Sequence, residues 1–223
     1  MAEEIRTILL NRSIADSIEE EAEELRQELK NRKIFLLNVM SSPGSGKTTT
    51  LIRLVNMMKD KYRIAIMEAD IDSDVDAITV ARETGVKSIQ LHTGGMCHLD
   101  GSMTRQGLEA LDGDFDFVIL ENIGNLVCPA EFDTGASLNM VILSIPEGSD
   151  KPLKYPLMFE KSDLVLINKI DTEEYFDFDY NIVEEFIFKR NKNASIYRIS
   201  AKNGTGMEDV KGHLESLIEA WRK

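Results

Sequence analysis

The segment SSPGSGKT at residues 41–48 constrains the fold of this chain more than any other part of the sequence. It follows the apolar run IFLLNVM at residues 34–40, and apolar residues then recur at helical spacing between Leu51 and Met58. A glycine-rich loop between a strand and a helix gathers backbone N–H groups and the positive helix N-terminus around a phosphate group. The order of strand, loop and helix therefore predicts a phosphate-binding loop of the Walker A type.

The side chains of this loop carry further chemistry. Gly44 and Gly46 allow close backbone approach to the phosphates, although Ser41 replaces the first glycine of the usual pattern. Lys47 can reach the β- and γ-phosphates, and the Thr48 hydroxyl can bind Mg²⁺. The alternative is a Gly-Ser turn that merely precedes a helix. The predicted nucleotide-binding residues of this loop are Pro43, Gly44, Ser45, Gly46, Lys47, Thr48 and Thr49.

Seven short apolar runs rich in β-branched residues are spaced along the chain, with helical patterns between them. They lie at residues 34–40, 63–68, 88–92, 115–121, 140–145, 163–168 and 195–200. Such runs are typical of parallel strands buried on both faces. The sequence predicts an α/β fold of the P-loop NTPase type, with a mostly parallel sheet of about seven strands and helices on both faces. Ligands bind such sheets at the carboxyl ends of the strands.

The first 32 residues show a different pattern. At residues 13–32, apolar side chains recur at steps of three and four among charged ones, which predicts an amphipathic helix. The stripe can pack on its own domain or on a partner, and we favour the first because it is the usual role of such a helix. The expected organisation is an N-terminal amphipathic helical segment at 1–32 and a P-loop domain at 33–223, which the motifs described next identify as a GTPase domain.

Charge and composition exclude several classes of protein. The net charge of −13 repels phosphate backbones, so we expect no nucleic acid partner. No apolar run approaches the ~20 residues that cross a bilayer, and the N-terminus lacks a basic signal-type region. We therefore expect no membrane partner and a cytoplasmic location. The two cysteines are too few for a disulfide framework.

A base-recognition motif, NKID, follows the predicted strand at 163–168. The Asp171 carboxylate can accept hydrogen bonds from both the ring N–H and the exocyclic amine of guanine, whereas adenine offers no such pair of donors. Asn168 can bond the other edge of the purine, and the Lys169 stem can cover its ring. The alternative role for Asp171 is a helix N-cap with Glu174 as its capping-box partner.

One strand later, the sequence SAK at residues 200–202 resembles the second guanine-contacting loop of GTPases, whose backbone N–H faces the base oxygen. Together with the phosphate loop, the two motifs predict a site for GTP and GDP. The predicted guanine-side residues are Asn168, Lys169, Asp171, Ser200, Ala201 and Lys202.

Acidic residues at two strand ends suggest where Mg²⁺ binds. Glu121 and Gly124 resemble the DxxG switch of GTPases with Glu for Asp, so that Glu121 can hold the metal while the Gly124 N–H meets the γ-phosphate. Asp70 and Asp76 are also expected near the metal. The predicted catalytic residues are Lys47, Asp76, Glu121 and Gly124. Because no Gln follows Gly124 to position water, we expect slow intrinsic hydrolysis, roughly 10⁻³ s⁻¹ by analogy.

Cys97, His98 and Cys128 also follow strand ends, on the side expected for the nucleotide. Two thiolates and an imidazole suit Ni²⁺ or Zn²⁺, and three ligands are one short of a closed structural zinc site. These residues therefore indicate a transfer site, or a site shared between two subunits. The alternatives are two buried free cysteines and a reversible disulfide.

The segments GGMCHLD and ENIGNLVCPAEFD, together with SSPGSGKTTT and NKID, resemble those of the hydrogenase nickel-incorporation GTPases, the HypB family of the SIMIBI class. The resemblance covers nearly everything from Ile34 onwards. It implies a GTP-regulated metallochaperone that helps to insert nickel into NiFe hydrogenases. The metal site would consist of Cys97, His98 and Cys128.

The resemblance also implies Mg²⁺ ligands and partners. Counterparts of Thr48, Asp70 or Asp76, and Glu121 bind Mg²⁺ in the family. The expected partners are a second copy of the chain, in a homodimer promoted by GTP or metal, a metallochaperone of the HypA family and the hydrogenase large-subunit precursor. Because Cys128 lies beside the switch, we expect the GTP and GDP states to differ in metal affinity.

Three other functions remain open. A related SIMIBI chaperone for another metalloenzyme such as urease would share the nucleotide motifs, but not the CHLD and ENIGNLVCP segments. A P-loop kinase of a small metabolite would need no guanine loop. A redox-sensing module would use Cys97 and Cys128 without a metal.

Overall fold

A parallel sheet of eight strands forms the centre of the molecule in the computed structural model, which describes residues 6–9, 18–70 and 75–223, with the backbone alone at 6–9, 18, 75 and 76. Its order is β1-β4-β3-β5-β2-β6-β7-β8, and each neighbouring pair is parallel. The strands are β1 (Arg6–Leu9), β2 (Phe35–Ser41), β3 (Ile64–Asp70), β4 (Lys87–His92), β5 (Phe117–Glu121), β6 (Leu138–Ser144), β7 (Leu164–Asn168) and β8 (Ser195–Arg198).

The predicted α/β fold is confirmed. All seven predicted strands are present as β2 to β8, and β2, β5 and β7 are buried along their whole length. β1 was not predicted, because its four residues lie within the segment expected to be helical. It pairs with β4 and extends the sheet at one edge.

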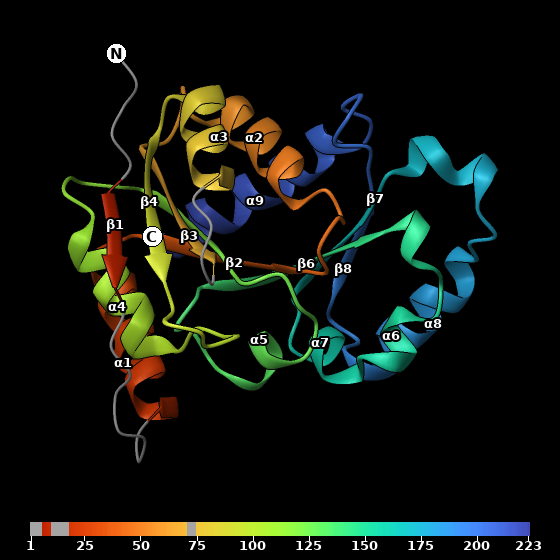
Figure 1. Cartoon of the computed structure of the whole chain (residues 1–223), viewed down its shortest axis with the longest axis horizontal. Coiled ribbons are helices and arrows are strands. Elements are labelled where there is room, and N and C mark those ends of the chain that lie inside the picture. The colour runs from red at the N-terminus through yellow and green to blue at the C-terminus, as the bar shows by residue number, and fades with distance from the viewer. Residues whose placement is uncertain (1–5, 10–17, 71–74) are drawn as a thin grey trace.

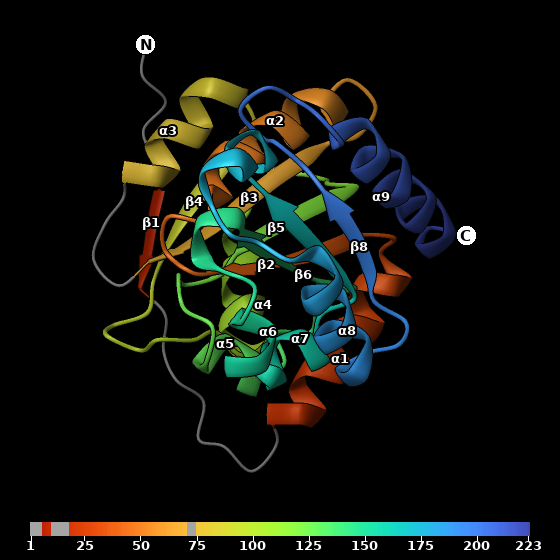
Figure 2. The ribbon, with the colours of Figure 1, turned by 90° about the vertical axis from the view of Figure 1, so that its right-hand side faces the viewer.

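Helices cover both faces of the sheet (Figure 1). One face carries α2 (Lys47–Met58), α3 (Val75–Thr84) and α9 (Met207–Trp221). The other carries α1 (Ile18–Asn31), α4 (Gly101–Ala110), α5 (Cys128–Glu131), α6 (Lys151–Lys154), α7 (Pro156–Glu160) and α8 (Tyr180–Arg190). Figure 2 shows the twisted sheet between these layers. Two short 3-10 helices, η1 (Ile145–Glu147) and η2 (Ile170–Tyr175), follow β6 and β7.

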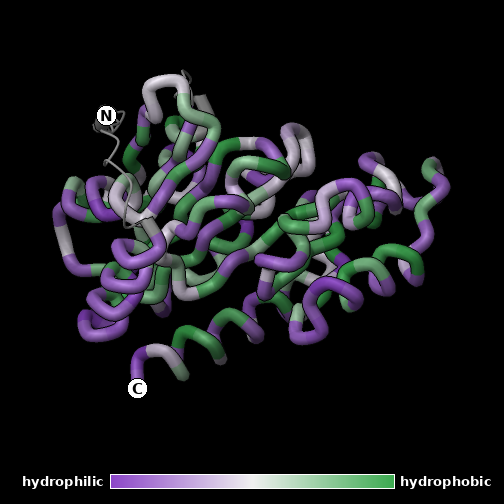
Figure 3. Tube along the Cα trace, turned by 90° about the horizontal axis from the view of Figure 1, so that it is seen from below, coloured by the Kyte–Doolittle hydropathy of each residue, from purple (hydrophilic) through white to green (hydrophobic). Residues whose placement is uncertain are grey.

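Apolar side chains fill the space between the sheet and each helix layer. The helix α9 illustrates the pattern, because Met207, Val210, Leu214 and Ile218 are all buried at steps of three and four. Hydrophobic and hydrophilic segments alternate along it accordingly (Figure 3). In the part of the chain that the structure describes, every helix falls short of the length and apolarity that a bilayer crossing requires.

The helix α1 packs on its own domain, as predicted. Ala22, Leu25 and Leu29 are buried, and burial of each leucine contributes about 1.5–3 kcal/mol of hydrophobic free energy. A Cβ at Gly101 of α4 would lie only 2.8 Å from the Ala22 Cα, so the two helices meet closely at this glycine. The described helix spans Ile18–Asn31, and the first residues of the predicted stretch, 13–17, lie outside the described residues.

Candidate functional site

The phosphate loop joins β2 to α2 at the carboxyl edge of the sheet. Gly44 and Gly46 adopt positive φ angles of 78° and 93°, a conformation that favours glycine. A Cβ at Gly46 would also lie 2.5 Å from the Asn168 Nδ2 atom. Glycine is therefore required at position 46 for two reasons. The loop continues directly into the N-terminus of α2.

A cavity of about 440 Å³ opens beside this loop. It is lined by Ser42, Pro43, Gly44, Gly46, Lys47, Thr48, Thr49, Glu68, Ala69, Asp70, Gln90, Glu121, Ile123 and Gly124. The structure thus brings most of the predicted phosphate and magnesium residues to one place. Asp76 lies in the first turn of α3, and its side chain is outside the described part of the structure.

Lys47 and Glu121 form an ion pair at the wall of this cavity. The Lys47 Nζ atom also donates to the Asn122 carbonyl oxygen at 3.3 Å. The side chains of Lys47 and Glu121 are only 14% and 3% exposed, so the attraction between their charges is screened less than it would be at the surface. The oxygen atoms of Thr48, Asp70 and Glu121 are hard ligands of the kind that Mg²⁺ prefers, and their residues line the same cavity.

Two polar residues of the cavity were missed by the sequence analysis. Glu68 and Gln90 lie inside apolar strands and are 3% and 1% exposed. The strand register pairs Glu68 with Gln90 on one side and with Glu121 on the other. The available signal was a polar residue at the end of the run RIAIME and another within SIQLH, because burial of a polar side chain is costly unless it is hydrogen-bonded.

The guanine motifs are tied to the phosphate loop by buried hydrogen bonds. Asn168, which is 2% exposed, donates from Nδ2 to the Ser45 carbonyl oxygen at 2.9 Å. Its Oδ1 atom accepts from the Ala201 N–H at 3.0 Å. Lys169 has a positive φ of 64°, and its Nζ atom donates to the Gly44 carbonyl oxygen at 2.6 Å. These contacts connect three loops that are far apart in sequence.

Asp171 faces the second guanine loop. Its Oδ1 atom accepts from the Ser200 hydroxyl at 2.5 Å. The alternative role as a helix N-cap is wrong, because η2 begins at Ile170 and Lys169 occupies its N-cap position. The structure thus brings Asp171 together with the loop at 200–202, within which Ala201 is buried and Lys202 is exposed.

Arg53 is a further residue of this region that the sequence analysis missed. From α2, its guanidinium donates to the carbonyl oxygens of Ala201 at 2.6 Å and Lys202 at 2.9 Å. The two acceptors lie 148 and 149 residues away, so no local pattern could reveal the contact. Arg53 connects the helix that follows the phosphate loop to the second guanine loop.

The structure brings the two cysteines together. Cys97 lies in the loop after β4 and Cys128 begins α5, yet their Sγ atoms are 2.7 Å apart. Both thiols are free and partly exposed. The neighbouring Cys97 thiol, together with burial and the charge of Glu131, raises the pKa of the Cys128 thiol. Two adjacent thiols that solvent can reach fit a soft or borderline metal ion.

His98 does not join the thiols in a three-residue cluster. Its ring stacks on that of Phe132, with the centroids 3.6 Å apart and the planes 7° from parallel. Among the described residues, no three His, Cys, Asp or Glu side chains are grouped so as to hold a metal ion. The three predicted ligands are therefore not assembled into one metal site within the described part of the chain.

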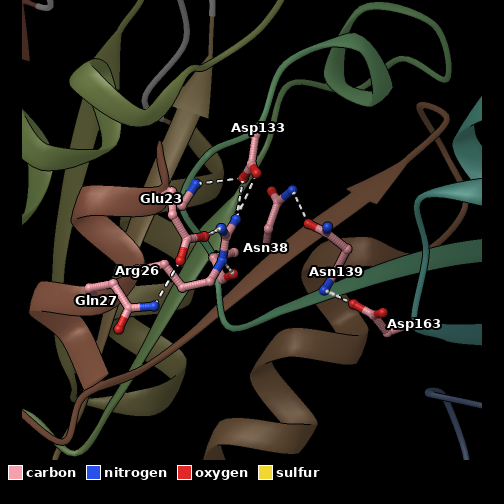
Figure 4. A network of polar contacts seen from close by, with 9 residues as sticks. Glu23, Arg26, Gln27, Asn38, Asp133, Asn139 and Asp163 are labelled. Atoms are coloured by element: carbon pink, nitrogen blue, oxygen red, sulfur yellow. Dashed lines mark hydrogen bonds and ion pairs between the residues drawn. The ribbon is translucent and has the colours of Figure 1, made fainter. Parts of the chain in front are cut away.

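The segment after α5 is anchored to α1 (Figure 4). Arg26 donates from Nη2 to both carboxylate oxygens of Asp133 at 2.7 Å, and from Nε to the Ala136 carbonyl oxygen at 3.0 Å. Arg26 also forms an ion pair with Glu23. The N-terminal helix thus fixes the chain shortly after Phe132, the residue on which His98 stacks.

Comparisons with known proteins agree with this geometry. Residues 35–198 match the family model described as "CobW/HypB/UreG, nucleotide-binding domain". The hydrogenase maturation factor HypB of Azotobacter chroococcum mcd 1 is 40% identical over 211 residues, which cover 94% of this chain and 69% of the relative. The hydrogenase/urease maturation factor HypB of Helicobacter pylori (strain ATCC 700392 / 26695) is 41% identical over 198 residues, which cover 86% of this chain and 81% of that protein.

The fold has a close counterpart among solved structures. The crystal structure of HypB from Helicobacter pylori in complex with nickel superposes with a TM-score of 0.84 at 39% sequence identity. The match covers 92% of this chain and 97% of the other.

Proposed function

Because the chain belongs to the HypB proteins of the CobW/HypB/UreG nucleotide-binding family, we propose that it is a GTP-hydrolysing metallochaperone for nickel in hydrogenase maturation. One observation carries the proposal. The phosphate and guanine loops and a pair of adjacent thiols lie at the same carboxyl edge of one sheet. A nucleotide and a soft metal ion can therefore bind to connected loops.

The proposed nucleotide chemistry follows from the cavity residues. The phosphate-loop N–H groups and Lys47 hold the phosphates, while the Asp171 carboxylate, beside the loop at 200–202, selects guanine. Thr48, Asp70 and Glu121, with Asp76, are the proposed ligands for Mg²⁺, which would neutralise phosphate charge when bound. The Gly124 N–H faces the γ-phosphate. Hydrolysis is slow because Asn125 and Leu126, instead of a water-positioning Gln, follow Gly124.

The proposed cargo site consists of Cys97 and Cys128, with His98 as a third ligand. The sulfur and imidazole donors suit Ni²⁺ and also Zn²⁺. The partial exposure of both thiols supports transfer of the ion in preference to permanent storage. We further propose that the chain acts as a homodimer promoted by GTP or metal. Its proposed partners are a HypA-type metallochaperone and the hydrogenase large-subunit precursor.

Urease is a second candidate for the enzyme served. The Helicobacter pylori relative carries the name hydrogenase/urease maturation factor, so one protein of this family is named for both enzymes. The same thiol pair would supply nickel in either case.

Transfer of radioactive nickel tests the proposal. The chain is loaded with ⁶³Ni and mixed with a hydrogenase large-subunit precursor, or separately with urease apoenzyme, with GTP or without nucleotide. We expect GTP-dependent labelling of the hydrogenase precursor. Failure of the loaded chain to label either acceptor, while it hydrolyses GTP, would contradict the metallochaperone function.

A further inference from the structure

The side chain of Asn125 bridges the two cysteine loops. Its Nδ2 atom donates to the Cys97 carbonyl oxygen at 2.8 Å. Its Oδ1 atom accepts from the N–H groups of Val127 and Cys128, each at 2.9 Å. An amide can act at once as donor and acceptor, which neither a carboxylate nor an apolar side chain can do. One side chain therefore links the backbones of both cysteines.

Asn125 is also connected to the phosphate cavity through the chain itself. The preceding residue, Gly124, lines that cavity and packs against Pro43 of the phosphate loop, where an added Cβ would lie 3.5 Å from the proline Cγ. The Asn125 N–H donates to the Ile123 carbonyl oxygen at 2.8 Å, which closes a tight turn between cavity and bridge. A shift of Gly124 must therefore move the Asn125 backbone, and with it the amide that holds both loops.

We propose that Asn125 is the positioning residue through which the nucleotide state acts on the thiol pair. The inference rests on the proposed function, because it assigns the control of the proposed cargo site. When the γ-phosphate draws the Gly124 N–H towards it, Asn125 turns with the backbone. The Cys97 carbonyl and the Cys128 N–H follow, and the spacing of the two thiols changes. Asn125 touches neither the nucleotide nor the metal in this scheme.

The effect of removing Asn125 differs according to whether its side chain only holds the loops in place or also transmits the nucleotide state to the thiols. If Asn125 only shaped the loops, its loss would weaken nickel binding by the same factor in both nucleotide states. If it carries the coupling, the ratio of the two nickel affinities must itself fall towards one. The ratio therefore separates the two roles, and it does not depend on turnover of GTP.

The test is nickel titration followed by the thiolate-to-nickel charge-transfer absorbance, with GDP or with a non-hydrolysable GTP analogue, each with Mg²⁺. In the unchanged chain we expect the two nickel affinities to differ by about fivefold or more, which is the usual lower range of coupling between sites. In Asn125→Ala we expect a ratio within about twofold of one, with GDP affinity within about threefold of the unchanged chain.

Asn191→Ala is the matched control. Asn191 makes the same kind of bridge at the end of α8, donating to the Ser162 carbonyl oxygen at 2.9 Å and accepting from the Asn193 N–H at 3.0 Å. This variant should keep the full ratio. If Asn125→Ala fails to fold, Asn125→Asp replaces it, because aspartate keeps the two acceptor bonds and loses the donor to Cys97, so the ratio should still fall.

An unchanged ratio in a folded Asn125 variant overturns the inference, and so does a ratio of one in the unchanged chain. Failure of the proposed function looks different. The unchanged chain would then show no nickel charge-transfer band or no hydrolysis of GTP, whatever residue 125 is.

Discussion

At the carboxyl edge of the sheet, the loops with the nucleotide motifs (the nucleotide end of the site) and the loops with the two cysteines (the cysteine end) are built differently. The phosphate and guanine loops are held by buried bonds from Asn168, by Lys169 and by the Arg53 guanidinium. The two cysteines lie on loops that the amide of Asn125 connects, and His98 is stacked on Phe132. A tightly held site suits selective binding of one nucleotide, whereas loosely joined ligands suit capture and release of an ion.

The largest effect should come from removing the phosphate-loop lysine. Lys47→Ala should lower the turnover of GTP by about 10²–10³-fold, because a cation aimed at the transferring phosphoryl group is lost. Nickel affinity measured without nucleotide should stay within about threefold, since the thiols do not contact this residue. Steady-state hydrolysis and nickel titration measure the two. Lys59→Ala, at the C-cap of the same helix, is the control and should leave both unchanged.

The complementary substitutions remove the thiols of the cysteine end and leave the phosphate-loop lysine in place. Cys97→Ala and Cys128→Ala should each weaken nickel binding by about 100-fold, a loss of about 2.7 kcal/mol, while GTP turnover stays within about threefold. Competition with a coloured chelator measures the affinity. His213→Ala serves as the control, because that ring packs near Tyr197 and away from the thiols. Loss of GTP turnover in the cysteine variants would show that the two ends are not separable.

The stability of the fold that supports both ends can be changed separately through Asp116. Hydrogen bonds from Arg63, opposed by burial and aided by the charge of Arg222, lower the pKa of this carboxyl group below its ordinary value of 3.8. Asp116→Asn should lower the free energy of unfolding by about 2 kcal/mol at neutral pH, because Arg63 and Arg222 lose a charged acceptor. Urea unfolding measures it.

The loss in free energy of unfolding caused by Asp116→Asn should depend on pH in a defined direction. A lowered pKa in the folded chain means that the ionised carboxylate stabilises the fold above its unfolded pKa, and that the stabilisation disappears as pH falls through the lower folded pKa. The difference in the free energy of unfolding between the unchanged chain and Asp116→Asn should therefore be constant near neutral pH and become smaller below pH 3.8. Asp114→Asn is the control, since Asp114 is 91% exposed and lies 3.7 Å from the same arginine. Its effect should stay below about 0.5 kcal/mol.

A smaller change tests how firmly the guanine loop is held. Arg53→Ala should raise the KM for GTP by about tenfold at nearly constant kcat, because two bonds to the loop carbonyls are lost without touching the reacting phosphate. Arg53→Lys should recover part of the affinity. The exposed Arg190→Ala should change neither constant. A fall in kcat with constant KM would mean that Arg53 acts on the phosphate end instead.

The sequence predicted the sheet well because seven strands are marked by buried apolar runs. It missed β1, whose four residues at the sheet edge carry too short a pattern to distinguish from a helix. Most of the residues predicted for the site follow strand ends, and the structure places Lys47, Asp70 and Glu121 among others around one cavity. It missed Glu68 and Gln90, which lie within strands, and Arg53, whose partners are distant backbone carbonyls.

The hydrogen bonds of Asn125 could not be predicted from the sequence either. From the sequence it was only the residue that replaces a catalytic Gln, because its hydrogen-bond partners come from a loop 28 residues away and from backbone N–H groups. The stacking of His98 on Phe132 could not be predicted either. Spacing identifies potential ligands, but packing between loops decides where each ring lies.

Nickel titration of the unchanged chain with GDP and with a non-hydrolysable GTP analogue tests most directly that the nucleotide end controls the cysteine end. We expect one nickel ion bound through thiolates, with affinities that differ between the two states by about fivefold or more. Equal nickel affinity in both states would contradict it.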